Sequence, residues 1–483
     1  MDVDDTRGLD YPRKTYTLWV TWLGAATPTR EKTMLSRFLN WFAPAPHIDQ
    51  LPDDEVKRLY PWFRWQILES TFLGYAMYYL VRNNVSVVSK DMIEALHYDK
   101  AMIGNIVAMT AICYGVGKFV MGALSDRSNP RVFMSVGLVL TALCNFAFGA
   151  STSYDVHFWL WALNGLVQGM GWPPCGRSMA HWYSEKERGL SFSIWNTSHN
   201  LGGGIAGVIA AESAARLGGW QYAFYVPGVL CLIGAVYLYW RLRDTPQSVG
   251  LPSVEEYRND YTEDMRKYGT HEQELTTREL LVKYVIAHPY IWLLAFANFF
   301  AYITRYSMLD WGPLYLREMK GATLSEGGIA TLMLEFGGIP STILLGWLSD
   351  KLGGRRGMVA TVAMLPILVA FAVIRVTPIG YLNLDMAMLV VIGLFIYPVI
   401  NFITIMALDL TSKKAIGTAA GFIGLFGYIG RTAQAKGFGE MLHYYEGLYG
   451  KQVAWDYVIY AILASTAIAV VLLAVTWKLK PKA

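Results

Sequence analysis

Two arginines in strongly apolar surroundings, Arg82 and Arg305, are the residues of this 483-residue chain that point most directly to chemistry. Arg82 lies in FLGYAMYYLVRNN, and Arg305 lies almost half of the chain later, in FANFFAYITRYSML. An unpaired arginine at bilayer depth costs about 3 kcal/mol on insertion scales, so it usually faces a water-filled path or a partner. Its planar fork of donors fits phosphate or carboxylate oxygens in a bidentate manner that lysine cannot match. The pair therefore predicts a site for an oxyanion.

An internal repeat gives the two arginines equivalent positions. The sequence GALSDR at 122–127 recurs as GWLSDK at 346–351, so that Asp126 corresponds to Asp350. The offset between these two aspartates agrees with that between the arginines to within one residue. A repeat of this length is a duplicated half-protein, and membrane transporters are its usual setting. We therefore expect one site on a pseudo-symmetry axis between two halves.

The composition is that of a membrane protein, because 54% of the residues are hydrophobic and only 16% are charged. Stretches of roughly 20 mainly apolar residues mark transmembrane helices. They lie at 64–86, 102–124, 132–151, 157–178, 191–211, 222–241, 288–312, 325–348, 358–378, 385–408, 415–438 and 455–477. The predicted fold class is an all-α membrane protein with twelve transmembrane helices in two pseudo-symmetric six-helix halves.

A charged segment divides these stretches into six and six, and lysine and arginine collect on one side of the membrane. The expected parts are a cytoplasmic N-terminal segment at 1–62, an N-terminal half at 63–241, a cytoplasmic central loop at 242–287, a C-terminal half at 288–478 and a cytoplasmic tail at 479–483. The basic loop residues are Arg127, Arg131, Lys186, Arg188, Lys351, Arg355, Arg356, Lys413 and Lys414. The positive-inside rule places their side and both termini in the cytoplasm. The net charge of +4 thus reflects topology and does not indicate nucleic-acid binding.

The sequence shows no nucleophile, metal-ligand spacing or nucleotide loop, so we expect no enzyme activity, no metal and no cofactor. The four cysteines, Cys113, Cys144, Cys175 and Cys231, all lie in apolar segments, as small core residues do. No cleavable signal peptide is evident. Met34, which opens MLSRFLNWFAPAPH, is a candidate start.

Longer motifs resemble the organophosphate:phosphate antiporters of the major facilitator superfamily. They are GMGWPPCGR at 169–177, WNTSHNLGGG at 195–204, RDTPQSVGLPSVEEYRNDY at 243–261, LDWGP at 309–313 and KKAIGTAAGFIGLFGY at 413–428. The resemblance covers about residues 34–480 and is strongest to the glycerol-3-phosphate carriers of that family. It implies the major facilitator fold for the two six-helix halves. It also implies import of an organic phosphate, glycerol-3-phosphate first, in exchange for inorganic phosphate by rocking of the two halves. It also implies a monomer in the bacterial inner membrane, with hexose-6-phosphate or phosphoglycerate as the alternative substrate.

The resemblance also implies the substrate-binding residues. They are Arg82, Arg305, His199, Lys118, Tyr75, Tyr79 and Tyr114. Each type has a structural alternative: an arginine or lysine near a helix end can reach the headgroups, a histidine can bridge helices, and tyrosines often serve packing. The repeat weakens this alternative for Arg82, whereas Lys118 lies only a few residues before a cytoplasmic loop.

Departures from the family leave the substrate open. Asn83 stands where glycerol-3-phosphate and hexose-phosphate carriers usually have lysine, and phosphoglycerate carriers resemble this chain at that position. Arg431 replaces a small residue of the glycerol-3-phosphate carriers. Lys436 resembles a lysine of the hexose-phosphate carriers, but Glu440 lies four residues later and could pair with it on one helix face. These positions are candidates for selectivity, with an ion pair between Lys436 and Glu440 as the alternative.

Two acidic residues in predicted helices, Asp310 and Glu335, are candidates for gating or for ion pairs with the cations. They also support a second hypothesis, a proton-driven symporter in which they carry protons. A third is a transporter-like receptor that senses a sugar phosphate. Such a receptor would bind its ligand without turnover.

Overall fold

The computed structural model describes residues 40–260, 286–410 and 416–479. The chain divides into two compact units, residues 1–43 and 44–483. In the described part of the first, the Ala43 amide donates to the Asn40 carbonyl oxygen at 3.2 Å. The candidate start at Met34, Lys413 with Lys414, and most of the expected central loop lie outside the described residues. All described helices of the membrane bundle belong to the second unit.

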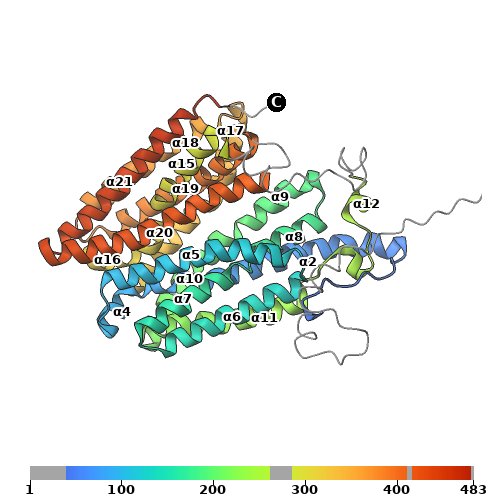
Figure 1. The fold of residues 1–483 in the computed structure, drawn as a ribbon, viewed down its shortest axis with the longest axis horizontal. Coiled ribbons are helices and arrows are strands. Elements are labelled where there is room, and N and C mark those ends of the chain that lie inside the picture. Colours follow the sequence, from blue (N-terminus) through green and yellow to red (C-terminus); the bar gives the residue numbers. More distant parts are fainter. Residues whose placement is uncertain (1–39, 261–285, 411–415, 480–483) are drawn as a thin grey trace, which may run out of the picture. The chain divides into compact units, whose positions relative to one another are not determined.

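The described part of the chain contains helices and no strand. The first group comprises α2 (Asp53–Leu80), α3 (Asn84–Val87), α4 (Ser89–Leu96), α5 (Lys100–Ser125), α6 (Pro130–Ala150), α7 (Tyr154–Gln168), α8 (Trp172–Trp182), α9 (Glu185–Asn196), α10 (Ser198–Leu217) and α11 (Tyr222–Arg241). A 3₁₀ turn, η3 (Pro246–Val249), and α12 (Val254–Arg258) follow. The second group comprises α15 (Pro289–Asp310), α16 (Gly312–Met319), α17 (Leu324–Lys351), α18 (Arg356–Val376), α19 (Leu382–Leu410), α20 (Ile416–Tyr449) and α21 (Lys451–Val475) (Figure 1).

Three of the spans are interrupted: α7 continues as α8, α9 as α10, and α15 as α16. The first break lies at residues 169–171, the first three of GMGWPP, where glycines and the prolines that follow disfavour a continuous helix. The third precedes Gly312 and Pro313, and proline is well tolerated at the start of the new helix. When each interrupted pair counts as one span, each group contains six.

Seven of the described helices are long and apolar enough to cross a membrane by length and composition. They are α5, α6, α11, α17, α18, most of α19, and α21. The other five spans contain α2, α7 with α8, α9 with α10, α15 with α16, and α20. These are shorter between breaks or richer in polar residues, and they include the spans that contain His199 and Arg305.

The two groups meet along two helix pairs, α5 with α20 and α10 with α17. A Cβ atom added at Gly104 of α5 would lie 2.6 Å from the Ala435 carbonyl oxygen of α20. One added at Gly328 of α17 would lie 2.5 Å from the Gly207 carbonyl oxygen of α10. Glycine is therefore required for this close approach. The second span of each group thus packs against the fifth span of the other, the arrangement that a duplicated half-protein produces.

At one end of the bundle, α4 of the first group lies beside α16 of the second, and we call this the α16 end (Figure 1). Both Arg317 terminal nitrogens contact the Asp91 carboxylate, at 2.5 and 3.0 Å. The Lys100 ammonium lies 2.6 Å from both Glu318 and Glu446. Charged pairs therefore join the two groups at this end. The basic loops after α5 and α17 lie at the opposite ends of their helices.

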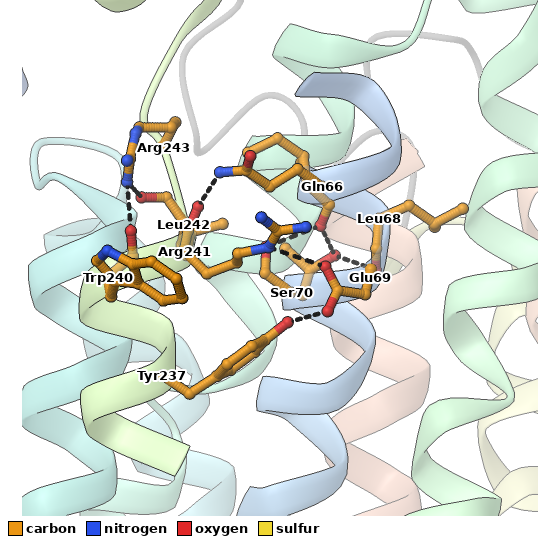
Figure 2. Close-up of polar contacts among 11 residues, drawn as sticks. Gln66, Leu68, Glu69, Ser70, Tyr237, Trp240, Arg241, Leu242 and Arg243 are labelled. Atoms are coloured by element: carbon orange, nitrogen blue, oxygen red, sulfur yellow. Dashed lines mark hydrogen bonds and ion pairs between the residues drawn. The ribbon is translucent and has the colours of Figure 1, made fainter. Parts of the chain in front are cut away.

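Polar contacts fix α2 against α11 at the opposite end (Figure 2). The Glu69 carboxylate accepts hydrogen bonds from the Tyr237 hydroxyl and from Arg241 Nε, the latter at 3.2 Å. The Gln66 amide donates to the Arg241 carbonyl oxygen. Asp244, just beyond α11, accepts from the Ala45 amide at 2.9 Å and so holds the chain before α2. These contacts orient the helix that leads to Arg82.

The helix around Arg82 differs from the expected span at 64–86. It begins at Asp53, with acidic residues in its first turn that suit the helix dipole. It ends at Leu80, so Arg82 lies in the turn before α3 and not inside a helix. The Arg82 amide donates to the Tyr79 carbonyl oxygen at 3.2 Å, which tightens this turn. The Asn84 side chain also fixes the turn by donating to the Ala223 carbonyl oxygen at 2.6 Å.

Candidate substrate site

Arg82 is buried, with 6% of its surface exposed, and its partners are neutral. Its Nε and Nη2 atoms lie 3.1 and 3.0 Å from the Gln168 side-chain oxygen. Gln168 ends α7, and its own amide donates to the Tyr78 carbonyl oxygen at 2.9 Å. The guanidinium carbon lies 3.9 Å from the ring centroid of Tyr79 and 4.6 Å from that of Tyr114. Gln168 therefore orients the arginine without cancelling its charge.

Arg305 is buried in the same way, with 7% exposed, on α15. Its guanidinium carbon lies 4.4 Å from the ring centroid of Tyr397 and 5.0 Å from that of Tyr306. Among the described residues its Nε atom has no hydrogen-bond partner. A buried guanidinium with an unused donor is a costly arrangement unless an anion completes it.

His199, near the start of α10, connects the surroundings of the two arginines. Its ring centroid lies 5.9 Å from that of Tyr79 and 6.0 Å from that of Tyr397. Arg82 lies over the first of these tyrosines and Arg305 over the second. His199 Nδ1 contacts the Asn196 carbonyl oxygen, so this nitrogen is the donor and Nε2 is left for another partner. The structure thus brings both arginines and His199 to one place between the two groups of helices.

The other predicted tyrosines, Tyr75 and Tyr114, pack against further aromatic rings around the two arginines. The Tyr75 and Tyr79 ring centroids lie 5.4 Å apart, and Tyr114 lies 5.1 Å from Tyr428 of the second group. Tyr428 in turn lies 5.7 Å from Tyr302. Tyr302 follows Tyr79 at the same offset that separates the two arginines, so the repeat could have identified it from sequence.

A family model described as "Major Facilitator Superfamily" matches residues 71–435, which include both arginines and His199. The chain belongs to the major facilitator superfamily. It is 40% identical over 444 residues to the "Glycerol-3-phosphate transporter" of Bacillus subtilis (strain 168), covering 91% of this chain and 98% of that protein. It is 37% identical over 446 residues to the "Probable hexose phosphate transport protein" of Chlamydia trachomatis serovar D, covering 90% of this chain and 96% of that protein.

A third relative is the "Membrane sensor protein UhpC" of Escherichia coli (strain K12), 37% identical over 382 residues that cover 78% of this chain and 86% of that protein. These relatives place the chain in the organophosphate:phosphate antiporter family, a family of membrane transporters, so the chain is not an enzyme. The structure of a bacterial homolog of the human lysosomal transporter Spinster, in an inward-facing conformation, matches with a TM-score of 0.66 at 17% identity, over 86% of this chain and 95% of that chain. The predicted major facilitator fold is confirmed.

Lys118, another expected substrate-binding residue, lies on α5 one turn after Tyr114. It is half-buried, and its ammonium lies 4.6 Å above the Trp172 ring of α8. It shares a helix face with Tyr114 but has no described contact with either arginine. Lysine over an indole is a favourable cation–π arrangement in its own right.

A third buried arginine, Arg431 of α20, lies beside Arg82 and Arg305 in the candidate site. Its Nη2 and Nε atoms lie 2.8 and 3.2 Å from the two Asp310 carboxylate oxygens. Nη2 also donates to the Asn83 side-chain oxygen at 3.2 Å. Gln434 donates to Asp310 at 2.7 Å. The sequence singled out Asn83, Asp310 and Arg431 separately, and the structure brings all three together.

The other candidate residues have different surroundings. Glu335 of α17 is buried, and its carboxylate accepts from the Asn200 amide of α10 at 2.8 Å, across the two groups of helices. It lies close to the glycines after His199, since a Cβ added at Gly203 would be 3.1 Å from Glu335 Oε1. Lys436 and Glu440 are exposed, and the described contacts include no ion pair between them.

Proposed function

We propose that this protein imports glycerol-3-phosphate in exchange for inorganic phosphate by alternating access. The observation that carries the proposal is the pair of buried arginines, one from each group of helices, joined through His199 and its two flanking tyrosines. Neither arginine has a described carboxylate within ion-pair distance. Two such cations can bind the oxygens of one phosphate group from both sides. His199 Nε2 can accept a hydrogen bond from a phosphate hydroxyl, or donate one when the imidazole is protonated.

The same charges favour exchange over one-way transport. When no anion is bound, the two buried guanidinium groups interact with only one described carboxylate, that of Glu335, which lies beyond ion-pair contact. Positive charge therefore remains in the site, and closing low-dielectric protein around it is unfavourable. A phosphate or phosphate ester carries a charge of about −1.5 to −2 near neutral pH and offsets it. The loaded site can therefore pass through the closed intermediate more easily than the unloaded one, so each inward step is coupled to an outward step.

The contacts between the two groups of helices support a rocking motion. The described ion pairs between the groups all lie at the α16 end, where Asp91 pairs with Arg317 and Lys100 with two glutamates. At the middle, Arg431 contacts Asn83 and Glu335 contacts Asn200. The α16 end is therefore closed. We infer that it faces outward, that both termini are cytoplasmic in a bacterial inner membrane, and that the protein acts as a monomer.

The tyrosines and Lys118 have supporting roles in this proposal. Tyr75, Tyr79 and Tyr114 supply hydroxyls that can bind the substrate without adding charge. Lys118, one turn from Tyr114, adds a cation on the side away from the α16 end. It would attract an incoming anion before the arginines bind it.

Counterflow into liposomes tests the proposal. The purified protein is reconstituted with internal phosphate, and uptake of labelled phosphate is measured against glycerol-3-phosphate, glucose-6-phosphate, 3-phosphoglycerate and phosphoenolpyruvate. We expect exchange, with glycerol-3-phosphate as the best organic substrate. A better hexose phosphate or phosphoglycerate would correct the substrate. The Escherichia coli relative named as a sensor motivates one control: binding without turnover would identify a receptor. Uptake driven by a pH gradient without internal phosphate would identify a proton symporter.

A further inference from the structure

The candidate site contains three buried arginines, and only one of them is in ion-pair contact with a described carboxylate. Arg82 contacts the neutral Gln168, and Arg305 has an unused donor. Arg431, by contrast, is paired with both oxygens of Asp310. The side-chain exposures in this pair are 4% for Arg431 and 0% for Asp310. The positive charge of Arg431 is therefore neutralised within the protein.

Arg431 is near enough to the two substrate arginines to contact the same ligand. Its guanidinium carbon lies 4.1 Å from the Tyr306 ring centroid, and that of Arg305 lies 5.0 Å from the same centroid. The two guanidinium groups can be no further apart than these two distances together. On the other side, Arg431 donates to Asn83, the residue next to Arg82 in the chain. Arg431 thus lies where the organic part of a phosphate ester bound by the other two arginines would extend.

Asp310 holds the position that a second anionic group of a substrate would need. A guanidinium binds a carboxylate through two parallel hydrogen bonds, and Asp310 already makes both. Gln434 contacts Asp310 at 2.7 Å and keeps it oriented toward Arg431. An incoming carboxylate would have to displace Asp310 and would also be repelled by it. A hydroxyl group meets no such competition.

We infer that Asp310 masks Arg431 and thereby makes the site selective for phosphate esters with an uncharged organic part over those that also carry a carboxylate. Arg431 is a cation that becomes available to substrate only when Asp310 is neutralised. This inference rests on the proposed function for the class of ligand. It adds to that proposal the residue that rejects phosphoglycerates.

Two ligands test the inference because they differ at one carbon. Glycerol-3-phosphate ends in an alcohol where 3-phosphoglycerate ends in a carboxylate, and the rest of the two molecules matches. Competition of each against labelled inorganic phosphate is measured on the purified protein in detergent, as a binding assay. The readout is the ratio of the two inhibitory concentrations.

Two variants unmask the arginine: Asp310→Asn, which keeps the shape of the side chain, and Asp310→Ser, which removes it. In both we expect the ratio to move toward 3-phosphoglycerate by at least about tenfold, the effect of one charged hydrogen-bonded contact. The matched control is the double variant Asp310→Asn with Arg431→Gln, which removes both charges and should keep the wild-type ratio.

Three results would overturn the inference. The first is an unchanged ratio in both unmasking variants. The second is the same shift in the double variant, which would show that Arg431 does not receive the carboxylate. The third is loss of phosphate binding in unmasking variants that still fold, since freeing a cation should not weaken the binding of an anion. The ion pair between Arg431 and Asp310 would then serve only to hold α20 against α15. If the wild-type protein binds these phosphates without exchanging them, the proposed exchange function fails. The ratio of inhibitory concentrations still decides whether Asp310 masks Arg431.

Discussion

Replacing either substrate arginine by lysine separates the charge of the site from its hydrogen-bonding geometry. Arg305→Lys is the simpler change, because the described contacts of Arg305 are with two aromatic rings, so lysine loses only the fork of donors and keeps the charge. One charge-assisted bidentate contact contributes on the order of 1.5 to 3 kcal/mol. At about 1.4 kcal/mol per factor of ten, phosphate affinity should fall roughly ten- to a hundredfold.

Arg82→Lys should be at least as damaging, because Arg82 also uses two nitrogens to bind Gln168. A lysine ammonium cannot both reach Gln168 and present two parallel donors to phosphate. Phosphate exchange in liposomes and phosphate-induced thermal stabilisation of the purified protein are the assays. Arg216→Lys, on an exposed pair with Glu212 in α10, is the matched control and should behave as wild type. Near-normal phosphate binding in both site variants would refute the two-arginine site.

Three further changes probe the surroundings of the site. Lys436→Ala should leave the substrate ranking in the counterflow assay unchanged, since this side chain is exposed and has no described ion pair with Glu440; a changed ranking would place it in the pathway. Lys100→Met should loosen the α16 end, because Glu318 and Glu446 lose the cation that they share. An impermeant reagent added from outside should then label a cysteine placed at Tyr306 faster, and unchanged labelling would argue against a gate there. Glu69→Gln should lower the free energy of unfolding by about 1 to 3 kcal/mol, because Tyr237 and Arg241 both donate to this carboxylate. Thermal unfolding in detergent checks this change, and a fall no larger than that of Glu212→Gln would contradict it.

The arginine pair shows what the sequence could predict. An apolar setting and a repeat offset shared with the aspartates Asp126 and Asp350 were sufficient to select Arg82 and Arg305 and to expect one shared site. The all-α major facilitator fold also followed from composition, span length and family motifs, and the comparisons confirm it. Both predictions depend on features that repeat along the chain. The roles of the individual site residues stay predictions until exchange is measured.

The partners of these residues could not be predicted in the same way. Gln168 contacts Arg82 because a break after α7 ends that helix beside the turn that follows α2. The contact between Arg431 and Asp310 joins residues 121 positions apart. For the cations of α20, spacing along the chain suggested a different kind of pair, that of Lys436 with Glu440 four residues later. Helical spacing predicts neighbours within one helix. It says nothing of which side chains face each other across two helices, because that depends on how the helices pack.

The distribution of apolar character along the chain connects these observations. The spans that contain His199, Arg305 and Arg431, and the helix that ends just before Arg82, are among the five that fall short of the length and composition of a membrane-crossing helix. Polar side chains lower the hydropathy of a span, and they are tolerated at bilayer depth when they face a shared interior. The more apolar α18 and α21 contribute none of these four residues. Low hydropathy in one span and its counterpart in the other half is therefore itself a signal of the substrate path, and α2 with α15 and α10 with α20 are the two such pairs here.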